Sequence, residues 1–115
     1  MSDKHSLRNS YPCNLVINNW KLINLEISQY YKTRPGREMI NDEMIIKMVE
    51  SLNHKRLIPD AKKNPSSWDY FTLKAVRHED KFYRLICCHE NNSSIWGIVN
   101  IYPITIKDHE KTKSN

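Results

Sequence analysis

The segment WDYFTLKAVRHEDKFYRLICCHENNSSIWGIVNIYPI, residues 68–104, decides the fold, because three strand patterns follow one another in it with polar turns between them. Apolar and polar residues alternate over 70–77, which is the period of a half-buried strand. Two further apolar segments follow, at 82–88 and 95–102. The last has apolar residues on both faces and is typical of a central strand that is covered on at least one side. The segment therefore predicts a three-stranded antiparallel meander.

One amphipathic helix is predicted upstream of the meander. Asn41 is a favourable N-cap, and Asp42 and Glu43 place negative charge near the positive end of the helix dipole. The apolar residues that follow have the i, i+3, i+4, i+7 spacing of one helix face: Ile45, Met48, Val49 and Leu52. We expect this face to pack on the sheet.

The region 11–27 contains two short apolar segments separated by Asn18 and Asn19. Alternation in the second segment favours a strand, and the two asparagines tolerate the positive φ of a hairpin turn. A helix over 15–25 is the competing interpretation. The predicted fold class is α+β, an antiparallel sheet made of the three-stranded C-terminal meander plus an N-terminal strand or hairpin, packed against one main helix.

The chain of 115 residues is long enough for one domain with one core. We expect a flexible N-terminus over 1–10, a single α+β domain over 11–106 and a polar flexible tail over 107–115. No apolar segment approaches the roughly 20 residues of a membrane-spanning helix, so no membrane partner is predicted. Three cysteines, two of them adjacent, argue against a disulfide framework and favour the reducing cytoplasm.

The net charge of +5 favours a polyanionic partner such as nucleic acid or an acidic protein. Two glycines in the whole chain are too few for a Gly-rich phosphate-binding loop, which excludes P-loop and Rossmann-type nucleotide chemistry. The basic residues form three clusters: Lys32/Arg34/Arg37, His54/Lys55/Arg56 and Lys74/Arg77/His78/Lys81/Arg84. If the helix covers one face of the sheet, the other face can gather side chains from two or three of these clusters.

A basic surface with tyrosine and histidine has the residue types that cleave RNA without a metal. Such cleavage needs a base for the ribose 2′ proton, an acid for the leaving 5′ oxygen and cations for the charge that builds on the phosphorane. Histidine transfers protons near neutral pH, arginine holds phosphate with two parallel hydrogen bonds, and tyrosine stacks on bases. The candidates for these three roles are His54, His78 or His89; Arg37, Arg77 or Arg84; and Tyr30, Tyr31 or Tyr83.

Structural interpretations stay open for the same residues. His54 follows the helix and has the position to complement its dipole, and His78 lies in a turn where water can solvate it. Arg84 alternates with apolar residues on its predicted strand. An ordinary ion pair with Glu26 or Glu43 is the alternative to a catalytic role for it. For the three tryptophans, packing in the core or at its rim is the favoured interpretation, rather than stacking on bases.

Residues 87–90, Cys-Cys-His-Glu, have metal-ligating side chains but no second ligand pair elsewhere. On a strand, Cys87 and His89 share a face while Cys88 points away. We therefore predict neither a metal site nor a cofactor.

The order of these parts over about residues 20–104 resembles the small RNase-toxin superfamily of barnase, RelE/ParE-type toxins and colicin-type tRNases. Several members carry a histidine in the early segment followed by arginines, whereas here Tyr30 and Tyr31 precede Arg34 and Arg37. RelE-type members rely on Arg, Lys and Tyr instead. The resemblance implies that Arg37, Arg84 and Tyr31 contact the phosphate and the transition state, and that His54 or His78 transfers the proton.

The sequence thus predicts a metal-independent ribonuclease of bacterial toxin type that cleaves tRNA or mRNA by 2′-OH transesterification and has an acidic cognate antitoxin or immunity protein. The expected catalytic residues are His54, His78, Arg84 and Arg37. The expected RNA-binding residues are Tyr31, Lys32, Arg34, Lys55, Arg56 and Arg77. The alternative is a non-catalytic phage- or plasmid-type module that binds nucleic acid or inhibits a host protein. An immunity-type role fits less well, since a partner of a basic target is usually acidic.

Overall fold

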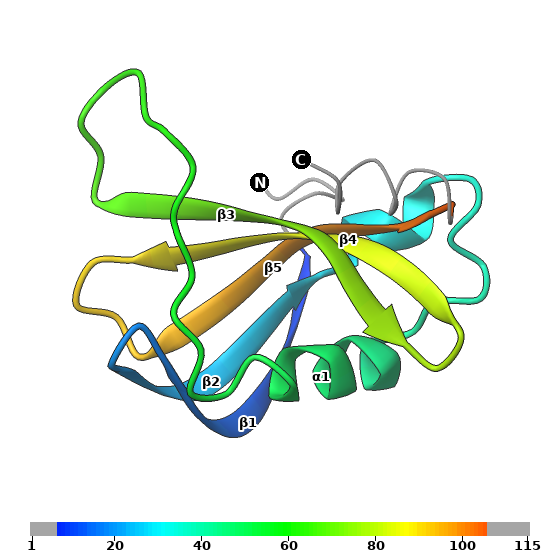
Figure 1. The fold of residues 1–115 in the computed structure, drawn as a ribbon, viewed down its shortest axis with the longest axis horizontal. Coiled ribbons are helices and arrows are strands. Elements are labelled where there is room, and N and C mark those ends of the chain that lie inside the picture. Colours follow the sequence, from blue (N-terminus) through cyan, green and yellow to red (C-terminus); the bar gives the residue numbers. More distant parts are fainter. Residues whose placement is uncertain (1–6, 106–115) are drawn as a thin grey trace.

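Five strands, one α-helix and one short 3-10 helix make up the fold in the computed structural model, which describes residues 7–105 (Figure 1). The strands are β1 (Arg8–Ile17), β2 (Trp20–Ser28), β3 (Trp68–His78), β4 (Lys81–Glu90) and β5 (Ile95–Ile104). The helices are η2 (Gln29–Thr33) and α1 (Asp42–Glu50). All five strands belong to one sheet with the order β1-β2-β5-β4-β3.

The α+β class and the C-terminal meander β3-β4-β5 are confirmed. Residues 8–28 form the β1–β2 hairpin, so the helix considered for 15–25 is wrong. The sheet itself is mixed rather than wholly antiparallel, because β5 returns beside β2 in the same direction and pairs residues 24–27 with 95–98. This parallel contact joins the N-terminal hairpin to the meander.

The predicted hairpin turn and the predicted helix N-cap both occur in the structure. Asn18 and Asn19 both have positive φ, 53° and 68°, which matches the two-residue turn that suits the twist of a hairpin. Asn41 is the N-cap of α1, and its side-chain oxygen accepts a hydrogen bond of 2.9 Å from the Met44 backbone N–H.

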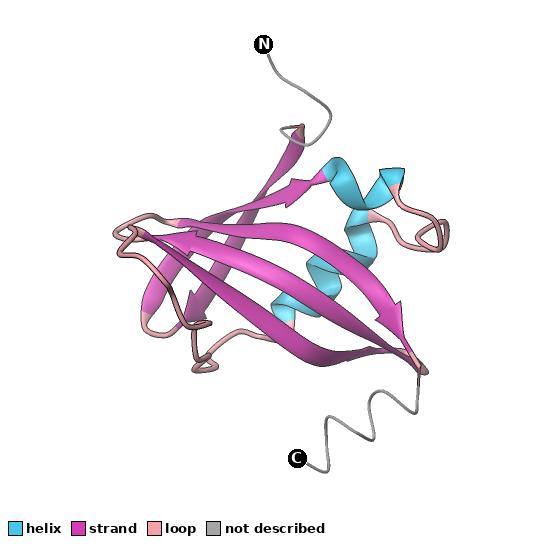
Figure 2. Ribbon diagram, turned by 90° about the horizontal axis from the view of Figure 1, so that it is seen from above, coloured by secondary structure: helices cyan, strands magenta, loops and turns pink. Residues whose placement is uncertain are grey.

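The core lies between α1 and one face of the sheet, and Figure 2 shows α1 behind the strands. Trp96, Phe71 and Leu85 are fully buried on this covered face. The predicted apolar face of α1 closes the core from the other side: Ile45, Met48 and Val49, with Leu52 beyond the helix end. The covered face is thus filled by side chains.

The opposite face of the sheet has no helix or strand of residues 7–105 lying over it (Figures 1 and 2). We call it the open face. Alternation along the strands sends every second side chain to it, among them Arg84 and Cys88 of β4. Binding groups on the strands are therefore to be sought on this face.

The predicted tail 107–115 lies outside the described residues, as do residues 1–6 of the predicted flexible N-terminus. Residues 8–10 were expected to be flexible too, but they belong to β1 and pair with 26–28. Within the described part of the chain, the structure has no helix with the length and apolar character needed to cross a membrane.

Candidate nucleic-acid interface

Two arginines converge on one tyrosine at one end of the open face. Arg84 of β4 and Tyr102 of β5 are partners in the antiparallel register, so their side chains leave the sheet on the same side. The Arg84 Cζ lies 6.0 Å from the centre of the Tyr102 ring, and the Arg37 Cζ lies 5.3 Å from the same centre. Both distances are in the range of cation–π contacts. We call these three residues the arginine–tyrosine cluster.

Arg37 reaches the cluster from the segment between η2 and α1. Its Nε donates to the Ile101 carbonyl at 2.9 Å, and its Nη1 donates to the Pro35 carbonyl at 2.8 Å. Gly36, which has a positive φ of 83°, makes the turn between Pro35 and Arg37. Two backbone anchors therefore hold the Arg37 guanidinium against the end of β5.

Arg84 is held by one backbone anchor. Its Nε donates to the Lys74 carbonyl at 3.1 Å, and its terminal nitrogens have no hydrogen-bond partner among residues 7–105. The ion pair considered with Glu26 or Glu43 does not form, because Glu26 pairs with Arg8 and Glu43 with Lys47. A guanidinium positioned through Nε keeps its outer N–H groups for an anion, and phosphate and carboxylate both have the geometry that suits that fork.

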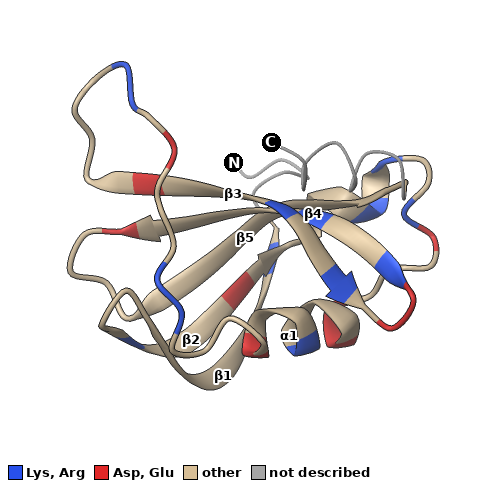
Figure 3. Ribbon diagram, in the orientation of Figure 1, with Lys and Arg blue, Asp and Glu red and all other residues tan. Residues whose placement is uncertain are grey.

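Positive charge is concentrated at this end of the sheet. Figure 3 shows several Lys and Arg on β3 and β4 near their connecting turn and in the segment before α1, where fewer Asp and Glu accompany them, and Asp and Glu again at the far ends of β3 and β4. Lys32 and Arg34 are exposed in that segment, which packs against β5. The arginine–tyrosine cluster thus lies within the most basic part of the open face.

The histidines expected to transfer protons lie elsewhere. His54 is exposed beyond the C-terminal end of α1, where its backbone N–H bonds to the Val16 carbonyl, whereas Arg37 precedes the N-terminal end of the helix. His78 shares a hollow on the covered side with Met39 and Met44, and its Nε2 lies 3.3 Å from Glu79 Oε2. The structure does not bring either ring to the arginine–tyrosine cluster.

His89 is a core residue. Its ring is 1% exposed, stacks on Trp20 with centres 4.0 Å apart and has its Nε2 2.9 Å from the Ser93 carbonyl. Cys87 shares this covered face and Cys88 does not, as the alternation predicted. Burial raises the pKa of the Cys87 thiol, which disfavours a thiolate nucleophile there. No group of three or more potential metal ligands gathers within residues 7–105.

The remaining predicted RNA-binding residues are divided between two places. Lys55 and Arg56 are exposed at the C-terminal end of α1, beside Asn18 and Asn19 and away from the cluster. Arg77 is exposed at the end of β3 and donates from Nε to the Glu79 carbonyl at 2.9 Å. Only Lys32, Arg34 and Arg77 remain available near the basic end of the open face.

Tyr31 is fully buried and has no ring face for a base. Its hydroxyl donates to Asp42 Oδ1 at 2.7 Å, and further donors complete a network around this carboxylate: Asn9 Nδ2 at 2.8 Å, Tyr11 Oη at 2.7 Å and Gln29 Nε2 at 3.2 Å to Oδ2. Burial by itself raises the pKa of Asp42, but these hydrogen bonds favour the carboxylate and lower its pKa overall. The network ties β1, η2 and α1 together.

Tyr102 is the member of the cluster that sequence reasoning missed. Counting back along an antiparallel pair through the turn at 91–94 would have approached it, but a bulge near Val99 shifts the register by one residue.

No protein-family model, curated protein or solved structure matches this chain. The chemistry open to the interface therefore follows from the geometry of the arginine–tyrosine cluster and the charge around it.

Proposed function

We propose that this protein is a metal-independent ribonuclease of bacterial toxin type, with RNA lying on the open face of the sheet. The observation that carries the proposal is the convergence of Arg37 and Arg84 on Tyr102. The two guanidiniums come from separate parts of the chain, and backbone carbonyls hold both of them. Paired, preorganised guanidiniums are suited to a phosphodiester group.

The proposed reaction is transesterification by the ribose 2′ hydroxyl. The 2′ oxygen loses its proton and attacks phosphorus, the bond from phosphorus to the 5′ oxygen breaks, and that oxygen takes up a proton. The products are a 2′,3′-cyclic phosphate and a 5′ hydroxyl. Arg37 and Arg84 would stabilise the negative charge on the phosphorane oxygens, while the Tyr102 hydroxyl or water carries the protons in place of His54 and His78.

An acidic antitoxin or immunity protein is the partner that fits this proposal. The net charge of +5 and the basic end of the open face favour association with a negatively charged surface. Such a partner would protect RNA by covering the arginine–tyrosine cluster.

Incubation with total tRNA and ribosomal RNA in EDTA, followed by a denaturing gel, tests the proposal. We expect discrete fragments with 2′,3′-cyclic phosphate ends, which Arg84→Ala abolishes. Arg56→Ala is the matched control, because it removes an exposed arginine at the C-terminal end of α1, away from the cluster. Intact RNA at high protein concentration, or equal cleavage by Arg84→Ala, would contradict the proposal.

A non-catalytic RNA-binding module is the second candidate, and the positions of His54 and His78 away from the cluster favour it. Such a module would bind RNA in a salt-sensitive way without producing fragments. Electrophoretic mobility shifts at two salt concentrations, run beside the cleavage assay, separate the two functions. Binding that is lost in Arg84→Ala while RNA stays intact would assign the cluster to binding alone.

A further inference from the structure

A cleft of about 460 Å³ opens at the other end of the open face, away from the arginine–tyrosine cluster. Its volume lies within the range of about 300–1,000 Å³ that small-molecule sites occupy. Both edges of the sheet contribute to it, with Trp68 and Tyr70 from β3 on one side and Arg8 from β1 with Glu26 from β2 on the other. The cleft therefore has an aromatic wall and a charged wall.

A row of residues across the sheet explains the hollow between these walls. Glu26 pairs with Gly97, Gly97 with Cys88, and Cys88 with Tyr70 in the strand register. The two central positions carry the smallest side chains of the row, so the floor is low. A Cβ added at Gly97 would lie 2.6 Å from Cys88 Sγ, so any larger residue there would push Cys88 aside and change the floor.

The two rings of the aromatic wall are partly exposed to solvent. Trp68 is 37% and Tyr70 47% exposed, and both belong to a strand at the edge of the sheet. Trp68 and Tyr70 are two positions apart on β3, so both rings lie on the same face of the sheet, the open face. Exposed aromatic rings beside a hollow provide surfaces on which a planar ring can stack.

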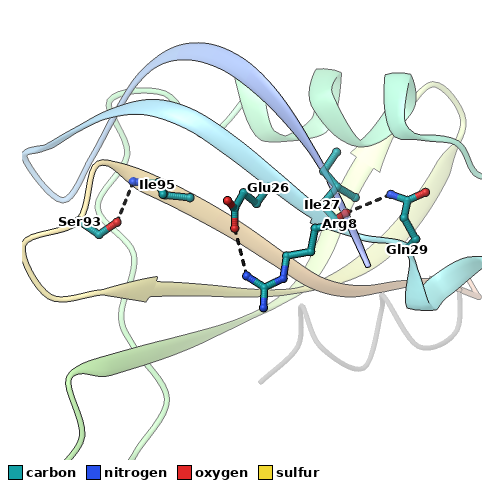
Figure 4. Close-up of polar contacts among 6 residues, drawn as sticks. All are labelled: Arg8, Glu26, Ile27, Gln29, Ser93 and Ile95. Carbon is teal, nitrogen blue, oxygen red and sulfur yellow. Dashed lines mark hydrogen bonds and ion pairs between the residues drawn. The ribbon is translucent and has the colours of Figure 1, made fainter. Parts of the chain in front are cut away.

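The charged wall supplies hydrogen-bonding groups for the edge of such a ring. Arg8 Nη1 donates to Glu26 Oε1 at 3.1 Å, as Figure 4 shows. Glu26 Oε2 has no hydrogen-bond partner within residues 7–105 and remains an acceptor, and Arg8 retains further N–H donors. A ligand that is planar, with donors and acceptors on its edge, satisfies both walls.

The cleft and the arginine–tyrosine cluster lie at two ends of one face, within reach of a single ligand chain. Cys88 in the cleft floor and Arg84 in the cluster lie four residues apart on β4, about 13 Å along the strand. A short single strand of nucleic acid can therefore contact both places, with its backbone at the arginines and a base in the cleft.

From these observations we infer that the cleft is a nucleobase-binding site, in which a base stacks on Tyr70 and Trp68 and the Arg8–Glu26 pair contacts its polar edge. This inference rests on the proposed function and names the part of the RNA that the second half of the open face binds. Free nucleosides are the probe, because they lack the phosphate that the arginine–tyrosine cluster would bind.

Titration of the isotope-labelled protein with each of the four nucleosides, followed by amide chemical shifts, tests the inference. We expect shifts at Tyr70 and Gly97 with at least one nucleoside, and about tenfold weaker binding in Tyr70→Ala, since that variant removes the ring on which the base stacks. Ile58→Ala removes an exposed apolar side chain outside the cleft and should leave the affinity unchanged. Glu26→Gln should change the relative affinities of the four nucleosides.

The outcomes distinguish this site from the proposed nuclease. Nucleoside binding that survives Arg84→Ala, whether or not the wild type cleaves RNA, supports the cleft. Absence of cleft shifts with all four nucleosides overturns the inference, as does equal binding by Tyr70→Ala. Cleavage of RNA without nucleoside binding would overturn the cleft while leaving the nuclease proposal standing.

Discussion

The two faces of the sheet are made by the same strands and differ in what their side chains have as partners. On the covered side, Asp42 and His89 are surrounded by partners: five hydrogen bonds from four side chains reach Asp42, and His89 lies between Trp20 and the Ser93 carbonyl. On the open face, Arg84 is anchored only through Nε. The hydrogen bonds of Asp42 and His89 join parts of the fold, whereas Arg84 keeps donors for the proposed RNA ligand.

This difference separates stability from function at the level of single residues. Residue type alone does not, because tyrosine and charged residues occur on both sides. Tyr31 is in the core and Tyr102 is on the open face. Substitutions on the two sides should therefore affect different measurements.

Asp42→Ala should have the largest effect and should act on stability. It leaves the donors of Tyr11, Tyr31, Asn9 and Gln29 without their acceptor; because the Tyr31 hydroxyl is buried and water cannot replace Asp42 there, the loss should be about 2–3 kcal/mol. Urea unfolding measures this loss. Glu43→Ala, at the exposed neighbouring position, should change stability by less than about 1 kcal/mol. Equal losses in the two variants would show that the network does not hold the covered side together.

Arg37→Ala should have the next largest effect and should act on RNA cleavage. Removal of one donor that stabilises transition-state charge costs about 100-fold in rate. Initial rates on a short RNA measure the loss. The free energy of unfolding, measured in urea, should stay within about 1 kcal/mol of the wild-type value, a smaller change than the one expected at Asp42. A rate that falls only in proportion to lost stability would erase the distinction between the two faces.

Acid should weaken the covered side through Asp42. The folded-state pKa of Asp42 lies below its ordinary value of 3.8, so its contribution is fully present above that pH and is lost as pH falls through the folded pKa. Unfolding free energies measured from pH 6 to pH 2 should fall more steeply in the wild type than in Asp42→Asn. Parallel curves for the two proteins would contradict this assignment.

Arg8→Ala should have the smallest effect on stability. The Arg8–Glu26 pair is 3.1 Å long but largely solvent-exposed, and such pairs contribute at most about 1 kcal/mol. Thermal unfolding at low and high salt measures it, with the small difference shrinking further in high salt. A loss comparable to that of Asp42→Ala would mean that the open face also supports the fold.

The local features of the fold could be predicted from the sequence. The meander, the asparagine turn and the N-cap at Asn41 depend on neighbouring residues, and all three are confirmed. The parallel pairing of β2 with β5 depends on residues distant in the chain, and no local pattern specifies it. The mixed sheet therefore could not be read from alternation alone.

The candidate site was predictable only in part. Arg37 and Arg84 are placed together as their proposed roles require, but the expected histidines are not with them. Tyr30 and Tyr31 are adjacent and alike in sequence, and only the η2 turn determines that Tyr31 is buried. Tyr102 and the cleft depend on register across several strands, which sequence periodicity does not supply.

The pairing of β2 with β5, which we call the β2–β5 seam, also determines when the proposed binding surface forms during folding. The hairpins join neighbours in the chain and close short loops, whereas residues 24–27 meet 95–98 only after a long loop loses its entropy. Arg37 and Tyr102 lie on opposite sides of this seam, and so do Glu26 and Tyr70. Neither the cluster nor the cleft is complete before the seam forms, so a partially folded chain with the N-terminal hairpin and the meander in place would still lack the proposed RNA-binding surface.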